Sequence, residues 1–315
     1  MEDNRISRQL REYLAYKRSL GFRLYGVERV LRQFSDYTLR AGYDGPLTQD
    51  IVLGWVSSDT DSDKTMGRRI EAVRPFSKYA HAFDPDAQVM QGRLYGNTHE
   101  RPVPYIFRED EVVRLMEESR GIYSPDGIRA YTIGTVIGLL WATGMRPSEP
   151  ARLTASDVDF TRQLIRIRNT KFAKERIVPV DGTVARRLQA YRQWIERKIG
   201  PISPDSAFFY TTGGAPLTER ALQYAFKLIR PCIDARPAGY PNVRLYDLRH
   251  TMACNTVRRW LEQGADVNAS LHVLSAYMGH SKPEDTFWYL SATPELMRLA
   301  CSKYEARFGG APDET

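Results

Sequence analysis

The end of the chain carries a histidine and a tyrosine at a spacing that could place both side chains at one reaction centre. His280 follows a helical stretch that ends at Met278, and Tyr289 comes nine residues later, after a turn and a helix start at Pro283. Proline suits the first turn of a helix, and the acids that follow it suit the positive end of the helix dipole. A tyrosine phenol can act as a nucleophile that stores a phosphoryl group as an ester. Because the chain has 18 tyrosines, a packed structural tyrosine is the default interpretation unless cations lie nearby.

Three further segments supply such cations. Arg146 stands at a helix start in TGMRPSEPARL, with Glu149 three residues later. The segment NTKFAKERIVP predicts a hairpin that presents Lys171 and Lys174, and RLYDLRHTMA places Arg249 in the first turns of a helix. Arginine forks can hold both non-bridging oxygens of a phosphate, and a lysine can protonate a departing oxygen. Taken singly, each segment also has an ordinary interpretation as a helix cap, a solvated hairpin lysine or an ion pair.

Together, and in this order, the segments resemble the tyrosine recombinase family of phage-type integrases and Xer-like recombinases. The resemblance spans roughly residues 105–295. It implies six catalytic positions: Arg146, Lys171, Tyr246, Arg249, His280 and the nucleophile Tyr289. It implies that Glu149 and Asp247 support these residues rather than bind a metal, and that no cofactor is needed. The family hairpin favours Lys171 over Lys174. Tyr277 has no counterpart in the family pattern, and Tyr304, which lies in the tail, is expected to be structural.

The sequence departs from the family pattern at two places. Tyr246 stands where the family usually has a histidine three residues before the second arginine, and a phenol is a poor proton shuttle at neutral pH. His250 directly follows Arg249, about 100° away around the helix, so it does not replace that histidine. The 31 residues from Arg249 to His280 exceed the family's usual spacing, which indicates an extended helical connection.

The elements around these residues predict a mainly α protein with a small antiparallel β-sheet. Apolar residues recur at helical spacing over 6–20 and 25–40, whereas 163–168 and 175–180 alternate as strands do. Gly127 to Ala142 is nearly apolar all round, which indicates a buried helix. We expect three parts: residues 1–92 as a helical domain that resembles the family's core-binding (SAM-like) domain, 93–104 as a linker, and 105–309 as the tyrosine-recombinase catalytic domain with a C-terminal docking tail.

Positive charge is concentrated in the N-terminal helices. Residues 5–40 hold nine Lys and Arg against three acids, and residues 64–78 hold five against one. Basic helices of this kind indicate a surface for a polyanion, nucleic acid first, although solvated helix faces would give the same count. The candidate DNA contacts are Arg8, Arg11, Lys17, Arg68 and Arg69.

Composition excludes several other classes. The chain is 42% hydrophobic and 26% charged, with a net charge of +7. It contains no apolar run near 18 residues and no signal peptide pattern, so we expect a cytoplasmic, nucleoid-associated protein that does not enter the membrane. Three cysteines and five histidines form no metal-ligand pattern, so a zinc site is not expected.

The predicted function is site-specific DNA recombination through a 3′-phosphotyrosyl intermediate, without a metal ion. The resemblance implies double-stranded DNA as partner and a homotetramer on DNA, or an assembly with sister recombinases. The tail from WYLSATPEL is similar to integrases of mobile elements. Two alternatives stay open at this point. A type IB topoisomerase shares the nucleophile and the cationic site, and a catalytically inactive DNA-binding accessory protein would keep the fold alone.

Overall fold

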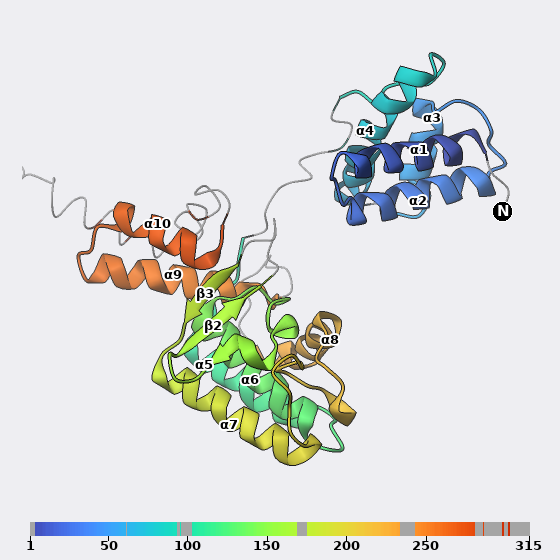
Figure 1. Cartoon of the computed structure of the whole chain (residues 1–315). Helices are drawn as coiled ribbons and strands as arrows, with labels where there is room; N and C mark the ends of the chain where they lie inside the picture. The colour runs from blue at the N-terminus through green and yellow to red at the C-terminus, as the bar shows by residue number, and fades with distance from the viewer. Residues whose placement is uncertain are drawn as a thin grey trace, which may run out of the picture. The chain divides into compact units, whose positions relative to one another are not determined.

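The computed structural model resolves the chain as two compact units, Met1–Arg101 and Pro102–Thr315. It describes residues 4–60, 62–92, 95, 103–168, 175–233, 243–280, 286, 298 and 302. The described part is mainly helical with one small antiparallel sheet, which confirms the predicted fold class (Figure 1).

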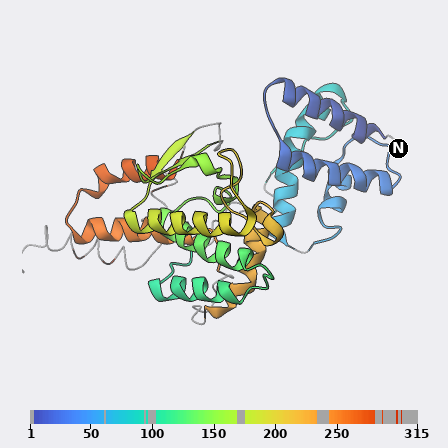
Figure 2. The same cartoon turned by 60° about the horizontal axis from the view of Figure 1, so that its bottom comes forward.

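Unit 1 is a helical bundle, drawn in blue to cyan in Figures 1 and 2. Its helices are α1 (Arg5–Ser19), α2 (Tyr25–Arg40), α3 (Gln49–Val56) and α4 (Asp63–Phe83). Thr48 and Ser62 cap the starts of α3 and α4, because their hydroxyl oxygens accept from backbone N–H groups of the first turn. The apolar face of each helix is buried in one core, in which Phe34 packs against Trp55 and Tyr13 against Phe76.

Unit 2 combines helices with the sheet. Its α-helices are α5 (Glu109–Glu118), α6 (Ile128–Thr143), α7 (Gly182–Ile199), α8 (Glu219–Ile229), α9 (Asp247–Glu262) and α10 (Val267–Met278). Its strands are β1 (Val158–Asp159), β2 (Leu164–Ile167) and β3 (Arg176–Pro179). Short 3-10 turns occur at η1 (Ser119–Gly121), η2 (Pro150–Arg152), η3 (Ala155–Asp157), η5 (Thr212–Gly214) and η6 (Arg230–Cys232).

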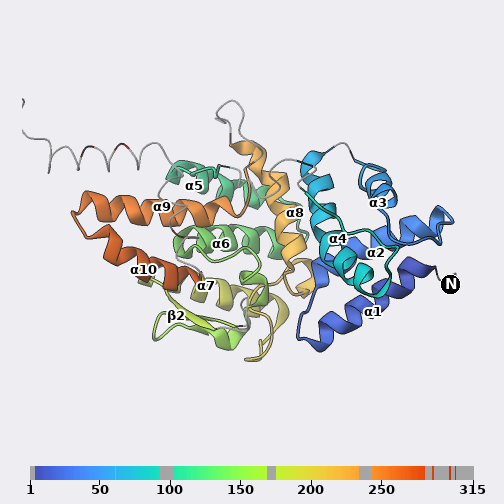
Figure 3. The ribbon, with the colours of Figure 1, turned by 90° about the horizontal axis from the view of Figure 1, so that it is seen from above.

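Helix α6 is the centre of unit 2. It packs against α5, α7, α8 and α9, and Figure 3 shows it between α7 and α9. Ten of its residues are buried, which confirms the buried helix that its sequence indicates. The helix ends at Thr143, and the next residue, Gly144, caps it with a left-handed φ of 61°. A Cβ there would collide with Cε of Met252 in α9, so glycine allows α6 and α9 to approach closely.

The sheet has the strand order β1-β2-β3 and is antiparallel throughout. Ile165 of β2 faces Val178 of β3, and both are buried, while Ile177 is exposed. The alternation follows the period of two that the sequence shows. Register places Ile167 opposite Arg176, so the ladder of β2 and β3 opens at an arginine.

Helices α9 and α10 share a small apolar core of their own, formed by residues such as Val257, Leu271 and Leu274. The chain turns between them at Gly264, with φ 72°, and Asp266 caps α10. The longer spacing between Arg249 and His280 is therefore helical, as predicted. Within the described part of the chain, no helix has both the length and the apolar character of a membrane span.

Candidate active site

Arg249 is the most deeply buried arginine of the predicted set, with 1% of its surface exposed. It lies in the first turn of α9. Its Nη1 donates to the carbonyl of Gly144 at 2.7 Å, and its Nη2 donates to the carbonyl of Met278 at 2.7 Å. The carbonyls at the end of a helix lack partners within the helix and lie at its negative end. Arg249 therefore joins the start of α9 to the ends of α6 and α10.

Arg146 reaches the neighbouring carbonyl. Its Nη2 donates to Gly279 O at 2.8 Å, directly after the Met278 carbonyl that Arg249 binds. Glu149 holds Arg146 from the other side, because its carboxylate accepts from Nη1 at 3.1 Å and from the backbone N–H at 2.8 Å. The side chain of Arg146 remains 26% exposed. The structure thus brings two predicted arginines to adjacent positions on one helix end.

His280 lies beside Arg249, as the sequence predicts for one site. Nη2 of Arg249 is 3.0 Å from Nε2 of His280, and the histidine Nδ1 is 2.7 Å from Oγ1 of Thr286. A guanidinium can only donate, so Nε2 accepts and a neutral ring carries its proton on Nδ1, which donates to Thr286. Thr286 is 1% exposed, and no sequence motif marked it.

Arg176 was not among the sequence-predicted residues, although it stands second in the strand segment ERIVP. Its Nη1 and Nη2 donate to Oε1 and Oε2 of Glu149, both at 2.7 Å, and its Nε donates to Tyr277 O at 3.1 Å. Burial raises the pKa of Glu149, but the hydrogen bonds and charges of Arg176 and Arg146 outweigh it and leave that pKa below its ordinary value. Glu149 is therefore ionised at neutral pH.

The end of α10 serves as a common anchor for these arginines. Three consecutive carbonyl oxygens, which we call the α10 anchor, each accept from a different arginine: Tyr277 from Arg176, Met278 from Arg249, and Gly279 from Arg146. Gly279 has a left-handed φ of 67°, and a Cβ there would stand 3.1 Å from Cδ of Arg176. The turn of the chain and the close approach of the arginine both favour glycine.

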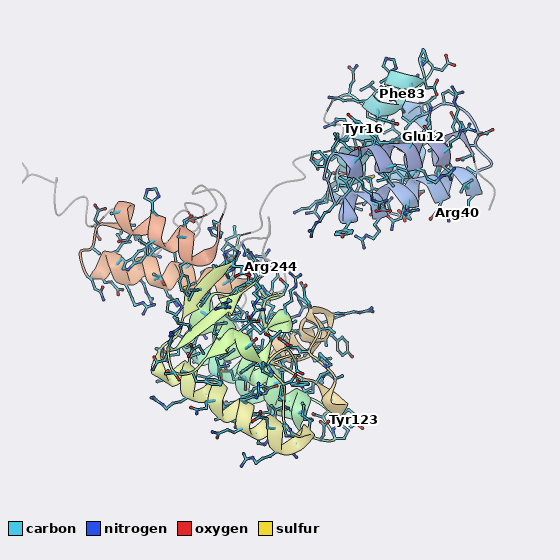
Figure 4. The ribbon with its side chains drawn as sticks, viewed as in Figure 1. Glu12, Tyr16, Arg40, Phe83, Tyr123 and Arg244 are labelled. Carbon is cyan, nitrogen blue, oxygen red and sulfur yellow. The ribbon has the colours of Figure 1, made fainter. Side chains whose placement is uncertain are left out.

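The start of α9 is fixed by a buried carboxylate. Asp247 is 1% exposed, accepts from the backbone N–H of Arg244 at 2.8 Å and pairs with its guanidinium at 2.6 Å (Figure 4 labels Arg244). Burial raises the pKa of Asp247, against the lowering effect of Arg244 and of the Tyr105 backbone N–H. Tyr246, the residue in the usual histidine position, is 38% exposed, and its ring meets the ring of His250 edge-on at 5.1 Å.

Several predicted residues lie outside the described part of the chain, namely Lys171, Lys174, Tyr289 and Tyr304. Tyr277, the tyrosine nearest to His280 before it, is described. Burial raises its pKa, although the charges of Arg176 and Arg249 oppose the shift. A phenol with a raised pKa is harder to ionise, so Tyr277 is poorly suited to act as a nucleophile.

The candidate DNA contacts of unit 1 differ in their surroundings. Arg8, Arg11 and Arg68 are exposed on α1 and α4, and the ammonium of Lys17 lies 4.7 Å from the ring centre of Phe22. Figure 4 shows the polar and aromatic side chains that cover these helices, including Glu12 and Tyr16.

Arg69 makes several contacts within unit 1. Its Nη1 donates to the carbonyls of Trp55 and Val56 at 3.3 and 2.9 Å, its Nη2 pairs with Asp59 at 2.5 Å, and its guanidinium covers the Trp55 ring. These contacts stabilise the end of α3 and engage the guanidinium of Arg69 within unit 1.

The described residues contain no group of three or more His, Cys, Asp or Glu side chains that could hold a metal ion. What they do hold is a set of guanidiniums around one helix end with a histidine beside it. Such an arrangement suits an anion with several oxygens, of which a phosphodiester is one.

Comparison with known proteins agrees with the resemblance seen in the sequence. A family model described as the phage integrase family matches residues 106–295. The chain is 32% identical over 302 residues to a Sinorhizobium fredii protein named as an integrase/recombinase, y4rE, with 95% of each chain covered. It is 26% identical over 310 residues to tyrosine recombinase XerD of Staphylococcus aureus, covering 95% of this chain and 98% of that protein.

Solved structures share the fold. The Tn1549 transposon integrase in complex with transposon right end DNA matches with a TM-score of 0.67 at 17% identity, covering 97% of this chain and 99% of that one. Lambda integrase bound to DNA matches with a TM-score of 0.59 at 13% identity, covering 83% and 90%.

Proposed function

The chain belongs to the phage integrase family of tyrosine-type site-specific recombinases, and we propose that it cuts and rejoins double-stranded DNA through a 3′-phosphotyrosyl bond to Tyr289. The observation that carries the proposal is the α10 anchor, where Arg146 and Arg249 occupy adjacent carbonyls with His280 alongside. This arrangement gathers the family's cationic residues at one place from three distant segments.

The proposed step is a phosphoryl transfer that conserves bond energy. The phenol oxygen of Tyr289 attacks the phosphorus, the bond from phosphorus to the 5′ oxygen breaks, and the strand remains attached through its 3′ phosphate. An ordinary phenol has a pKa of about 10, so about one in a thousand is ionised at pH 7. Positive charge at the phosphate favours the ionised phenol and the charge that grows in the transition state.

The roles of the other residues follow from their chemistry. The forks of Arg146 and Arg249 bind the non-bridging oxygens, and Lys171 gives a proton to the departing 5′ oxygen. Tyr246 can donate a hydrogen bond to the phosphate. We propose that these cationic side chains do the work that a metal ion does in other phosphoryl transfer enzymes, so the reaction is independent of metal.

The rest of the proposal concerns organisation. We propose residues 1–92 as the core-binding domain, 93–104 as the linker and 105–309 as the catalytic domain with a docking tail. Arg8, Arg11, Lys17 and Arg68 would contact DNA phosphates. The tail would bind a neighbouring copy, which gives a homotetramer on DNA. The transposon integrase among the structural relatives supports an origin in a mobile element.

Trapping the covalent adduct tests the proposal. With a duplex nicked beside the scissile phosphate, the released fragment diffuses away, and wild type should give a DNA-linked band that resists denaturant, disappears with protease and survives excess EDTA. Tyr289→Phe should bind the duplex normally and give no adduct, while Tyr277→Phe, the matched control, should still give it. If wild type forms no adduct, the chain is a binding protein without this chemistry, and loss in EDTA with recovery in magnesium would refute metal independence.

A further inference from the structure

Arg176 lies outside the set of residues that the family pattern assigns to catalysis, yet its side chain is among the most firmly held in the site. It is 10% exposed and begins β3, two residues after the end of the predicted hairpin tip. Each of its three guanidinium nitrogens donates one hydrogen bond, two to Glu149 and one to Tyr277 O. Three of its five N–H groups are thus held by Glu149 and Tyr277 O, and both oxygens of its carboxylate partner are engaged, so the contacts of Arg176 are those of a residue that holds other groups in place.

Glu149 links Arg176 to Arg146. The fork of Arg176 meets both carboxylate oxygens at 2.7 Å, which fixes the plane of the carboxylate. The same two oxygens accept from Nη1 and the backbone N–H of Arg146. Any rotation of the carboxylate would therefore move Arg146, and Arg176 opposes that rotation.

The α10 anchor links Arg176 to Arg249. Its bond to Tyr277 O is the first of the three consecutive carbonyl contacts, and Arg249 binds the next carbonyl. The Cδ of Arg176 also lies against Gly279, where an added Cβ would stand 3.1 Å away. Strand β3 and the end of α10 are thus fastened together at the point where both catalytic arginines attach.

We propose that Arg176 is a positioning residue that acts through Glu149 and the α10 anchor to hold the guanidiniums of Arg146 and Arg249 in the geometry that binds the scissile phosphate. The inference rests on the proposed DNA cleavage. Catalytic groups must be held closely, since a misplacement of about 1 Å can cost about a hundredfold in rate. A merely structural arginine would lower stability without acting through Arg146.

The sheet offers a matched control. Arg168, the residue after β2, pairs with the buried carboxylate of Asp157 at 2.6 Å, so it is also an arginine on a buried acid. Its pair has no bond to the α10 anchor among the described contacts. Arg168→Gln should therefore lower the melting temperature as an arginine loss does, without changing the rate of cleavage.

The test is single-turnover formation of the covalent adduct at saturating full-length protein, with affinity for uncut duplex measured in parallel. Arg176→Gln should reduce the adduct rate about 10- to 100-fold while that affinity is unchanged. In an Arg146→Lys background, where the fork that Arg176 positions is already gone, Arg176→Gln should cost far less. Such non-additivity is expected of residues that act as one unit.

Two results would overturn the inference. An equal loss from Arg176→Gln in the wild-type and Arg146→Lys backgrounds would show that Arg176 acts on the fold alone. Rescue of Arg176→Gln by a substrate with sulfur at the 5′ bridging position would show that Arg176 serves the lysine on the hairpin, because a thiolate leaves without a proton.

If Arg176→Gln gives no folded protein, Arg176→Lys, which keeps a cation on Glu149 but loses the fork, enters the same two tests. Adduct formation by wild type is measured first, because its absence would refute the proposed function and not the role of Arg176.

Discussion

In each unit, arginine side chains bind the carbonyl oxygens at the end of a helix, but the two helix ends have different partners. At the end of α3 in unit 1, Arg69 binds two carbonyls and pairs with the carboxylate of Asp59 while covering the ring of Trp55. At the α10 anchor in unit 2, three arginines meet three consecutive carbonyls, and one buried carboxylate, Glu149, contacts two of the three.

The difference lies in what happens to the charge. A carboxylate neutralises the guanidinium that it orients, so the cap on α3 is complete in itself. A carbonyl orients a guanidinium but has no formal charge, so a cation held mainly by carbonyls keeps its charge for an anion that arrives later. The same interaction therefore closes a helix in unit 1, and in unit 2 it leaves positive charge for the phosphate that we propose to bind there.

The largest effect is expected when one arginine fork in each unit is replaced. Arg249→Lys keeps the charge but cannot bind Gly144 O and Met278 O together, and the rate of adduct formation should fall by about 10² to 10³, as for loss of an oxyanion donor. Arg69→Lys should leave the rate at saturating DNA unchanged. Single-turnover kinetics measure both, and equal rate losses would show that the two helix ends do not differ in function.

A second prediction concerns charges that remain open to solvent in unit 1. Neutralising Arg8, Arg11 and Arg68 together to glutamine should weaken binding to every duplex sequence and reduce the slope of log K against log salt by about 0.9 for each lost phosphate contact. Arg69→Gln should lower the stability of unit 1 and leave the slope unchanged. Titrations at several salt concentrations provide the measurement. An unaltered slope in the triple variant would mean that these arginines are simply solvated.

Arg68 and Arg69 show what sequence could and could not give. Both stand in one basic helix, and their residue type alone marked both as DNA contacts. A step of about 100° around the helix leaves Arg68 exposed and turns Arg69 onto the end of α3, which depends on packing between helices that are distant in the chain. Local patterns did predict the buried α6 and the main strands, because these follow from local periodicity.

In the candidate active site too, some residues were predicted from the sequence and others depend on packing between distant segments. The resemblance marked Arg146, Arg249 and His280, and the structure brings these three together. Arg176 was not predicted because its contacts form only when three segments come together: the loop after α6, strand β3 and the end of α10. No local pattern marks a residue whose partners are 27 and 101 positions away. Tyr289 and Lys171 stay predictions.

A smaller effect is expected from the glycine that lets α6 and α9 approach. Gly144→Ala places a side chain on a left-handed residue, which costs about 1–2 kcal/mol, and adds a clash with Met252. Gly264→Ala, at φ 72° with no atom near its added Cβ, should cost the backbone term alone. Urea denaturation compares the two. Equal losses would show that Met252 moves aside and that the close contact beneath Arg249 is not tight.

The smallest expected effects, and the most specific, come from two buried carboxylates with opposite pKa shifts. The pKa of Glu149 is lowered, since its arginines outweigh its burial, and the pKa of Asp247 is raised, since its burial outweighs Arg244. An unfolded glutamate has a pKa of about 4.3 and an unfolded aspartate about 3.9. The stability that Glu149 contributes is therefore present above about pH 4.3 and is lost as the pH falls below it. For Asp247 the sign reverses, because the folded state binds the proton more tightly and stability falls as the pH rises above about 3.9.

The two carboxylates can be separated by subtracting denaturation curves of the variants from those of wild type. The stability advantage of wild type over Glu149→Gln should increase with pH up to about 4.3 and then stay constant. The advantage over Asp247→Asn should be greatest at the acid end and decrease as the pH rises. If both differences increase with pH, the pKa of Asp247 is not raised. If both decrease, the pKa of Glu149 is not lowered, which would mean that Arg176 and Arg146 do not hold Glu149 ionised and that the α10 anchor lacks the carboxylate that joins two of its arginines.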